Sequence, residues 1–189
     1  MNAASFSSLS ADHQRLQALV GAWRGEEDVA ATQWTDAGTA TSEVLAEAQF
    51  GGLFVVQRYR QRRDGTISFG SHNVFGFDQQ RKLVTMHQFD SMGFVPATPA
   101  TGIWNGAELV LERSSPRGSA RVTYIFDGDD TYRMRLQFKP TGSDVWQDMV
   151  SGVYRRVSPT LLSLALEAAG DTAGDIGGNQ WNREELYDR

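Results

Sequence analysis

Three histidines are the residues of this chain best suited to proton transfer or metal binding at neutral pH. His13 lies on the polar side of a predicted N-terminal helix, and we expect it to be solvated. His72 and His87 lie in two successive segments with strand composition, so their imidazoles meet across a sheet if the register suits. The sequence has no cysteine and no closely spaced pair of histidines. We therefore expect no metal site.

The alternation of apolar residues predicts where these two imidazoles point. Phe69 lies on the face opposite His72, whereas Leu83 and Phe89 share a face with His87. Apolarity therefore points His87 inward and His72 away from the aromatic side chains. The inner face of a ligand-binding barrel can also be the more mixed one, so the phase of the strands stays open.

Acidic and aromatic residues in the same region complete the candidate site. Asp90 begins the segment Asp90–Gly93, whose aspartate, serine and glycine also favour a turn. A carboxylate or an imidazole that lines a cavity can act as an acid or a base, so His87 and Asp90 are the candidate catalytic residues. The residues predicted to line a ligand site are Tyr59, His72, His87, Asp90, Trp104, Tyr124 and Met134.

Arginines and net charge bear on the class of partner. Arg58, Arg60 and Arg62 alternate along one predicted strand. They form either an exposed wall or a rim that grips a ligand carboxylate or phosphate. The formal net charge is -5, whereas proteins that bind nucleic acid without sequence preference are normally basic. We therefore expect a small-molecule ligand and no nucleic acid.

The sequence predicts that nearly all the segments that position these residues are β-strands. The stretch Gly51–Gly93 contains three aromatic and β-branched segments separated by turn residues, which is typical of an antiparallel meander. Asn105-Gly106 predicts a tight hairpin further along. Segment 43–48 taken alone also suits a helix, but its neighbours favour a strand. About ten strands follow one another between residues 22 and 157.

The sequence therefore predicts an all-β fold, a closed antiparallel up-and-down barrel. A sandwich is the alternative arrangement of the same strands. We expect three parts: residues 1–21 with a short plug helix capped by Ser10, the barrel over 22–157, and residues 158–189 with a helix and a flexible tail. Trp181 and Tyr187 in that tail are anchors for the barrel or for a second copy of the chain, which would make a homodimer.

Targeting signals are not evident. The first residues show no basic segment followed by an apolar one, and no apolar run approaches the roughly 20 residues that span a bilayer. We expect a soluble, cytoplasmic protein with no membrane partner.

The segment Gly21-Ala22-Trp23 follows the short helix directly, and this arrangement resembles the calycin superfamily of lipocalins, fatty-acid-binding proteins and nitrobindins. The resemblance implies that Trp23 plugs one end of the barrel, covered by Arg155 or Arg156 from the final strand. Three further motifs, at 51–54, 76–78 and 90–93, resemble the bacterial family called domain of unknown function 1579. That likeness covers roughly residues 16–157 and implies architecture rather than chemistry.

Haem is a cofactor to weigh because nitrobindins share the predicted architecture. The proximal histidine of that family lies late in the chain, whereas the last histidine here is His87. We therefore expect no haem and no other cofactor.

These observations favour a protein that binds a small, largely apolar molecule in the barrel lumen. The alternative is an enzyme that uses the same lumen, a cyclase, isomerase or decarboxylase with acid–base chemistry from histidine, aspartate or tyrosine. A third possibility is an assembly protein whose barrel merely supports a docking surface.

Overall fold

The computed structural model describes residues 9–32, 35–93 and 95–160. The chain begins with helix α1 (Ala11–Leu16) and a 3-10 turn (Gln17–Leu19). The strands are β1 (Gly21–Val29), β2 (Gly38–Gln49), β3 (Phe54–Arg63), β4 (Thr66–Asp78), β5 (Leu83–Asp90), β6 (Ala100–Asn105), β7 (Glu108–Ser115), β8 (Gly118–Phe126), β9 (Thr131–Pro140) and β10 (Gln147–Val157).

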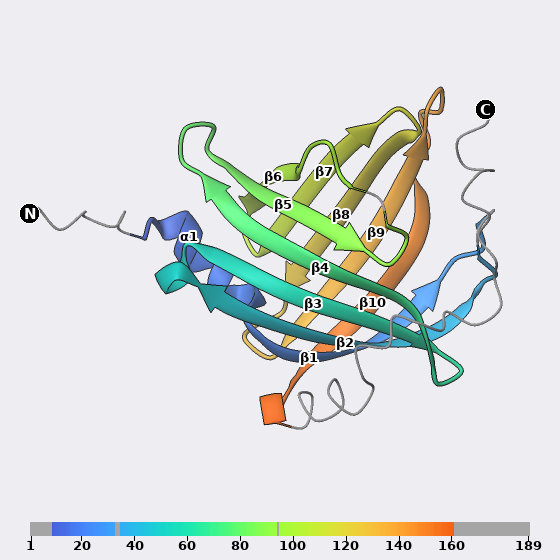
Figure 1. The fold of residues 1–189 in the computed structure, drawn as a ribbon, viewed down its shortest axis with the longest axis horizontal. Coiled ribbons are helices and arrows are strands. Elements are labelled where there is room, and N and C mark those ends of the chain that lie inside the picture. The colour runs from blue at the N-terminus through green and yellow to red at the C-terminus, as the bar shows by residue number, and fades with distance from the viewer. Residues whose placement is uncertain (1–8, 33–34, 94, 161–189) are drawn as a thin grey trace, which may run out of the picture.

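The strands form one closed antiparallel barrel (Figure 1). Each strand pairs with the next along the chain, and β1 pairs with β10 to complete the ring. The predicted up-and-down barrel is thus confirmed, and the sandwich is excluded. Segment 43–48 belongs to β2, so the strand interpretation was correct. The predicted C-terminal helix and tail lie outside the described residues, apart from residues 158–160.

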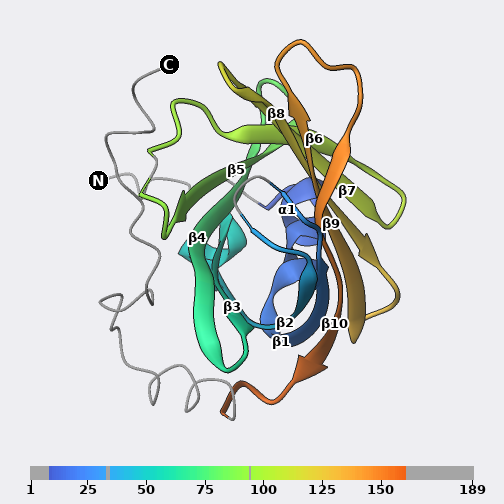
Figure 2. The same ribbon diagram turned by 90° about the vertical axis from the view of Figure 1, so that its right-hand side faces the viewer.

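Helix α1 closes one end of the ring, as the end-on view in Figure 2 shows. Ser10 caps the helix in a reciprocal capping box: its hydroxyl accepts from the backbone N–H of His13, and its own backbone N–H donates to His13 Nδ1 at 3.2 Å. His13 is 3% exposed and packs edge-on against Phe77. The expectation of a solvated His13 was wrong, because its side chain completes the cap and faces the barrel.

The closed end is built around Trp23, which is 1% exposed. Its indole N–H donates to the carbonyl oxygen of Leu19 at 3.0 Å, and the guanidinium of Arg156 lies 4.1 Å from the ring centre. Arg156 also donates to the carbonyl oxygens of Val20 and Asp129. Its cation thus joins the start of β1 to the turn before β9.

Of the two arginines expected to cover Trp23, Arg156 does so and Arg155 does not, so the choice of Arg155 as part of the plug needs correction. Successive residues of a strand point to opposite faces, and Trp23 opposes Arg156 in the register of β1 and β10. Arg155 points outward instead and lies 3.7 Å from the carboxylate of Glu26.

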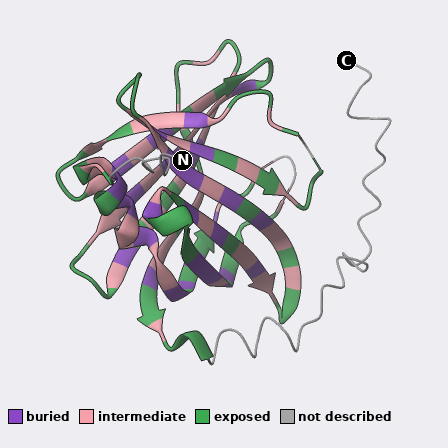
Figure 3. Ribbon diagram, turned by 60° about the vertical axis from the view of Figure 1, so that its left-hand side comes forward, coloured by how far each residue is buried: buried purple, intermediate pink, exposed green. Residues whose placement is uncertain are grey.

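Alternation of burial along the strands fixes which side chains face the lumen (Figure 3). On β1, Trp23, Gly25, Glu27 and Val29 are buried while the residues between them are exposed. The β2–β3 corner turns sharply because Gly51 and Gly52 adopt φ values of 68° and 98°, which glycine tolerates. The ladder between β5 and β6 is short, running from Val84 to Met86 on β5.

No helix in the described part of the chain is long and apolar enough to cross a membrane.

Candidate functional site

A cavity of about 980 Å³ occupies the lumen between the closed end and the opposite end of the barrel. We call that opposite end the mouth; it is formed by the turns after β1, β3, β5, β7 and β9. The cavity volume lies at the upper end of the range, about 300–1,000 Å³, that holds small molecules. Every strand of the described barrel contributes to its lining. The loops at the mouth add Thr32, Thr35, Ser91 and Met92.

One side of the cavity is apolar. Met86 on β5, Leu111 on β7, Val122 and Tyr124 on β8, and Met134 on β9 line it. Beneath them the aromatic rings of Tyr132 and Tyr154 stack with centroids 4.5 Å apart, and Tyr132 meets Trp23 edge-on. These contacts form a continuous aromatic floor that separates the cavity from the closed end.

The other side carries a polar group of side chains that we call the Glu27 cluster: Tyr59, Gln61 and Tyr154, which line the cavity, and Glu27 behind them. Glu27 is 3% exposed and accepts a hydrogen bond from the hydroxyl of Tyr154. The Tyr59 hydroxyl lies 2.9 and 3.0 Å from the two carboxylate oxygens, and the Gln61 amide donates at 2.7 Å. Neutral donors from two strands, β3 and β10, thus surround one buried carboxylate on β1.

Two glycines make room for this cluster. A Cβ atom on Gly25 would lie 2.2 Å from the Ser42 hydroxyl oxygen and 2.6 Å from the Tyr154 ring. A Cβ atom on Gly152 would lie 2.8 Å from Cγ of Glu27. Contacts this short do not occur between real side chains, so the glycines let the tyrosine ring and the carboxylate occupy the lumen.

The tyrosines of the lumen are held in their neutral form. Burial raises the pKa of Tyr154 well above its usual value, and the neighbouring Tyr59 hydroxyl and Glu27 carboxylate raise it further. Burial also raises the pKa of Tyr59, again with a contribution from Glu27. Burial alone raises the pKa of Tyr124. These phenols are therefore hydrogen-bond donors and acceptors, not anions, at any physiological pH.

A second polar pair lies beside the cluster on β3 and β4. The side-chain amide of Asn73 donates to Gln57 at 2.9 Å, and both residues line the cavity. Asn73 is 6% exposed, and its Oδ1 atom has no hydrogen-bond partner among the described residues. A buried acceptor without a donor is costly, so this atom has capacity for a ligand or water.

Charged residues lie nearer the mouth. Arg63 donates to the Thr35 hydroxyl at 2.8 Å and lines the cavity. Asp90 lines it too and accepts from the backbone N–H of Met92 at 3.0 Å. Burial raises the pKa of Asp90, although that backbone bond and the positive charge of Arg113 oppose the shift. This carboxylate is therefore easier to protonate than a solvated one.

Four of the residues predicted from sequence line the cavity: Tyr59, Asp90, Tyr124 and Met134. Trp104 does not; it packs beside Phe126 with centroids 5.7 Å apart, and its ring lies under Arg15 at the α1 end. His72 and His87 are both exposed on the outside of the barrel. The inward prediction for His87 was wrong.

The error for His87 has a physical reason. On β5 the buried residues are Val84 and Met86, so Gln88 and Asp90 face inward and His87 faces outward with Phe89. Phe89 is 49% exposed. The inner face of β5 is the mixed one because the lumen is a cavity rather than a packed core, so apolarity misidentified the face.

Sequence reasoning also missed Glu27. The residue stands in the acidic run Glu26-Glu27-Asp28 of the first predicted strand, where three charged residues in succession give no sign that one of them is buried. The sequence did contain one signal, because residues separated by an even number of positions in a strand share a face. Trp23 was predicted to be buried, and Glu27 lies four residues further along the same strand.

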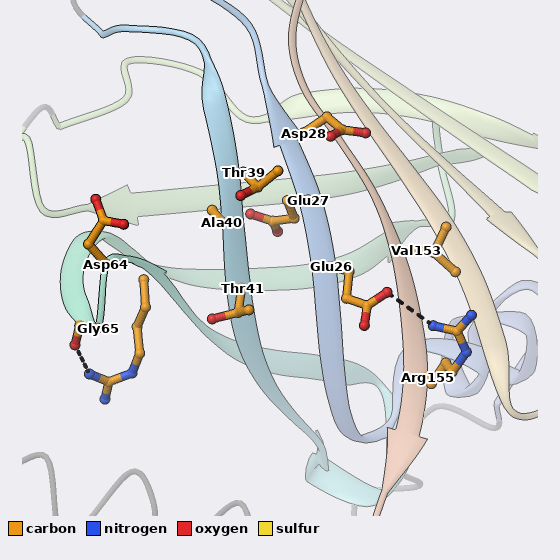
Figure 4. A pocket seen from close by; sticks show the side chains of 11 residues that line it. Glu26, Glu27, Asp28, Thr39, Ala40, Thr41, Asp64, Gly65, Val153 and Arg155 are labelled. Atoms are coloured by element: carbon orange, nitrogen blue, oxygen red, sulfur yellow. Dashed lines mark hydrogen bonds and ion pairs between the residues drawn. The ribbon is translucent and has the colours of Figure 1, made fainter.

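The outer face of the barrel near β1 has a separate pocket of about 570 Å³ (Figure 4). Glu26 and Arg155 border it, and the dashed line in the figure marks their ion pair. Arg62 also borders it, and the alternation of β3 places Arg58 and Arg60 on the same outer side. The arginines proposed from sequence thus lie on the outer wall, while Arg63 and Arg113 face the cavity.

Metal binding has no support in the part of the chain that the structure describes. No group of three or more histidine or acidic side chains there is arranged to hold an ion. The prediction of no haem rests on the positions of the histidines and stays a prediction.

The family model described as "Protein of unknown function (DUF1579)" matches residues 8–156. The chain belongs to this family. The match spans α1 and nearly the whole barrel, so the resemblance expected from the motifs is confirmed. No curated protein is similar enough to this DUF1579 chain to count as a match.

Two solved structures show the same fold as this DUF1579 barrel. Rv2717c from M. tuberculosis is 20% identical with a TM-score of 0.61, over 79% of this chain and 99% of that one. The S-type phycobiliprotein lyase CPES from Guillardia theta is 10% identical with a TM-score of 0.55, over 79% of this chain and 94% of that one. At such low identities the likeness concerns the fold alone.

Proposed function

We propose that this protein binds a small, largely apolar molecule in the barrel lumen. The observation that carries the proposal is the cavity of about 980 Å³, which the chain's own side chains leave open although the barrel is closed at one end. An apolar side formed by methionine, leucine and valine, faced by a few fixed polar groups, is the usual composition of a small-molecule site. Methionine also adapts its shape to a ligand.

The open lumen argues against a role in assembly alone. A barrel that only supported a docking surface would be more stable with a filled interior, because a cavity removes packing contacts. Selection for a ligand explains why the volume is retained.

The test uses N-phenyl-1-naphthylamine, a neutral apolar probe that fluoresces in dry sites. We expect saturable binding with one site per chain. In Met134→Trp the larger ring projects into the cavity and takes up part of the space, and the probe should bind at least about tenfold more weakly, the effect of losing one well-packed group. The matched control is Ile103→Trp, because Ile103 is 60% exposed on the outer face. Equal binding to both variants would place the probe on the surface and overturn the proposal.

Native mass spectrometry of freshly purified protein complements the probe. A co-purified molecule that disappears in Met134→Trp but stays in Ile103→Trp would identify the natural ligand or its class.

The second candidate is an enzyme in the same lumen, and Asp90 is the observation that favours it. This carboxyl faces the cavity, and burial raises its pKa towards the range of a working acid. One protein with this fold is named a lyase, so the architecture is compatible with catalysis. Incubating the co-purified molecule with the protein and following its NMR spectrum tests this candidate, because an isomerisation or a cyclisation can leave the mass unchanged. Conversion that is lost in Asp90→Asn supports an enzyme, and an unchanged spectrum supports binding alone.

A further inference from the structure

Every side-chain hydrogen that the Glu27 cluster can donate is already engaged in a hydrogen bond within the chain. The hydroxyls of Tyr59 and Tyr154 both donate to Glu27. The two amide hydrogens of Gln61 are directed to Glu27 at 2.7 Å and to the Tyr59 oxygen at 3.3 Å. Ser68 lies 3.0 Å from the remaining atom of that amide, Oε1, and donates to it. What the cluster offers to the cavity is therefore lone pairs on the phenolic oxygens.

Asn73 adds an independent acceptor to the same side of the lumen. Its amide N–H₂ is directed to Gln57, and its buried Oδ1 atom is unpaired among the described residues. Gln57 and Tyr59 are successive inward residues of β3, so Asn73, which pairs with Gln57, lies diagonally across from Tyr59. Such diagonal neighbours are about 7 Å apart, close enough for one ligand head group to reach both.

The charge of this region is negative and uncompensated. The donors to Glu27 are two phenols and one amide, all neutral, and Glu27 takes part in no ion pair of the described residues. Arg63 and Arg113 line the cavity nearer the mouth, and Arg63 already donates to Thr35. A buried carboxylate held by neutral donors alone is stabilised when a cation approaches, because desolvation is costly for an unpaired charge.

We infer that the lumen selects a lipophilic amine, whose ammonium group donates to the Tyr59 and Tyr154 oxygens and to Asn73 Oδ1 while its apolar part lies along the methionine and leucine side. The inference rests on the proposed function and adds the chemical class of the ligand. An ammonium group has three donors and no acceptor, which matches a surface of acceptors. An alcohol supplies one donor and no charge, so it should bind at the same place more weakly.

The decisive test compares two probes of equal length, decylamine and decan-1-ol, by calorimetry at pH 7. The amine is then cationic, as lysine is. We expect decylamine to bind the wild-type protein at least about tenfold more tightly than decan-1-ol, the gain typical of a charge-assisted hydrogen bond. Equal affinities, or a preference for the alcohol, would overturn the inference without any mutant.

Glu27→Gln keeps the shape of the side chain and removes its charge. The preference for decylamine should fall to about threefold or less, while decan-1-ol binding stays within about twofold. The matched control is Glu26→Gln, the same change one residue away, on a side chain that is 81% exposed outside the barrel. That control should keep the full preference. A preference that survives Glu27→Gln, or that Glu26→Gln lowers equally, would show that the amine responds only to overall charge.

The outcomes also separate this inference from the proposed function. If neither probe binds and N-phenyl-1-naphthylamine does not bind either, the lumen is not a ligand site and both fail. If decan-1-ol binds as well as decylamine, the lumen binds ligands and only the amine selectivity fails. Should Glu27→Gln not fold, Tyr59→Phe removes one acceptor, and it should weaken decylamine more than decan-1-ol.

Discussion

The closed end and the Glu27 cluster both bury polar side chains in the barrel, but their hydrogen bonds differ. At the closed end the indole N–H of Trp23 donates to the carbonyl oxygen of Leu19, and Arg156 covers the ring while donating to two backbone carbonyls. In the lumen the side-chain donors are also hydrogen-bonded within the chain, but the oxygen atoms of Tyr59, Tyr154 and Asn73 can each still accept a hydrogen bond. Trp23 and Arg156 thus find their partners within the chain, whereas the lumen contains acceptors without a donor among the described residues.

This difference separates stability from function within one barrel. Changes at the closed end should lower the free energy of unfolding and leave ligand selectivity alone. Changes in the lumen should alter selectivity at a smaller structural cost. The predictions below test that division.

Trp23→Ala should have the largest effect on stability. Truncating a buried tryptophan costs about 3–5 kcal/mol, and each kcal/mol lowers the melting temperature by about 2–4 °C in a domain of this size. We expect a loss of roughly ten degrees, measured by thermal unfolding, and substantial recovery in Trp23→Phe. Trp146→Ala is the control, because that ring lies on the outer surface beneath Arg121 and should cost little. Loss of probe binding in a stable Trp23→Phe variant would contradict the assignment of the closed end.

Gly25→Ala should have the next largest effect. The added Cβ atom meets Ser42 and the Tyr154 ring at 2.2 and 2.6 Å, so the Glu27 cluster must shift. We expect a loss of about 1–3 kcal/mol, typical of an overpacked interior, together with weaker amine binding. Gly70→Ala is the matched control in another strand, where the nearest atom would lie 3.6 Å away. Equal stability of the two variants would show that the lumen yields more easily than the contacts suggest.

Asp90 should make stability depend on pH in a direction unusual for a carboxylate. Its pKa is raised in the folded protein, mainly by burial, so the folded state holds the proton more tightly than the unfolded state. Stability therefore falls as the pH rises from the unfolded pKa through the folded one. Asp90→Asn should melt higher than the wild type at pH 7, and the gap should close towards pH 4. A gap that does not vary with pH would mean that burial of Asp90 has no energetic consequence.

Haemin titration should give the smallest effect. His72 and His87 are exposed on the outer face, and His13 is engaged in the helix cap, so we expect no sharp, saturable Soret shift. A saturable shift that disappears in His87→Ala would contradict this prediction.

The strand order could be predicted from sequence because its signals are local. Asn105-Gly106 and Asp64-Gly65 mark hairpin turns, and β9 alternates apolar and polar residues at every step. In an up-and-down barrel local hairpins determine nearly the whole topology, so local signals were sufficient.

The site was less predictable because it depends on which face of each strand meets the cavity. Leu83 and His87 share a face that looked internal, yet the lumen takes the polar face of β5 with Gln88 and Asp90. The Glu27 cluster joins residues from β1, β3 and β10, and no local pattern brings distant strands together. The assignment of Arg156 rather than Arg155 as the residue that covers Trp23 likewise depends on the register of β1 and β10, which the sequence alone does not give.

The single long-range pairing of the barrel has a consequence for folding. All other ladders form between neighbours along the chain, but β1 and β10 join residues as far apart as Ala22 and Val157. Closing so long a loop costs chain entropy that only the contacts formed at closure can offset, which makes this seam the expected final step. The contacts between Arg156 and Trp23 and between Tyr154 and Glu27 both cross it. A chain in which β1 and β10 have not paired therefore lacks both the closed end and the Glu27 cluster. Ligand binding is thus a measure of whether β10 has paired with β1.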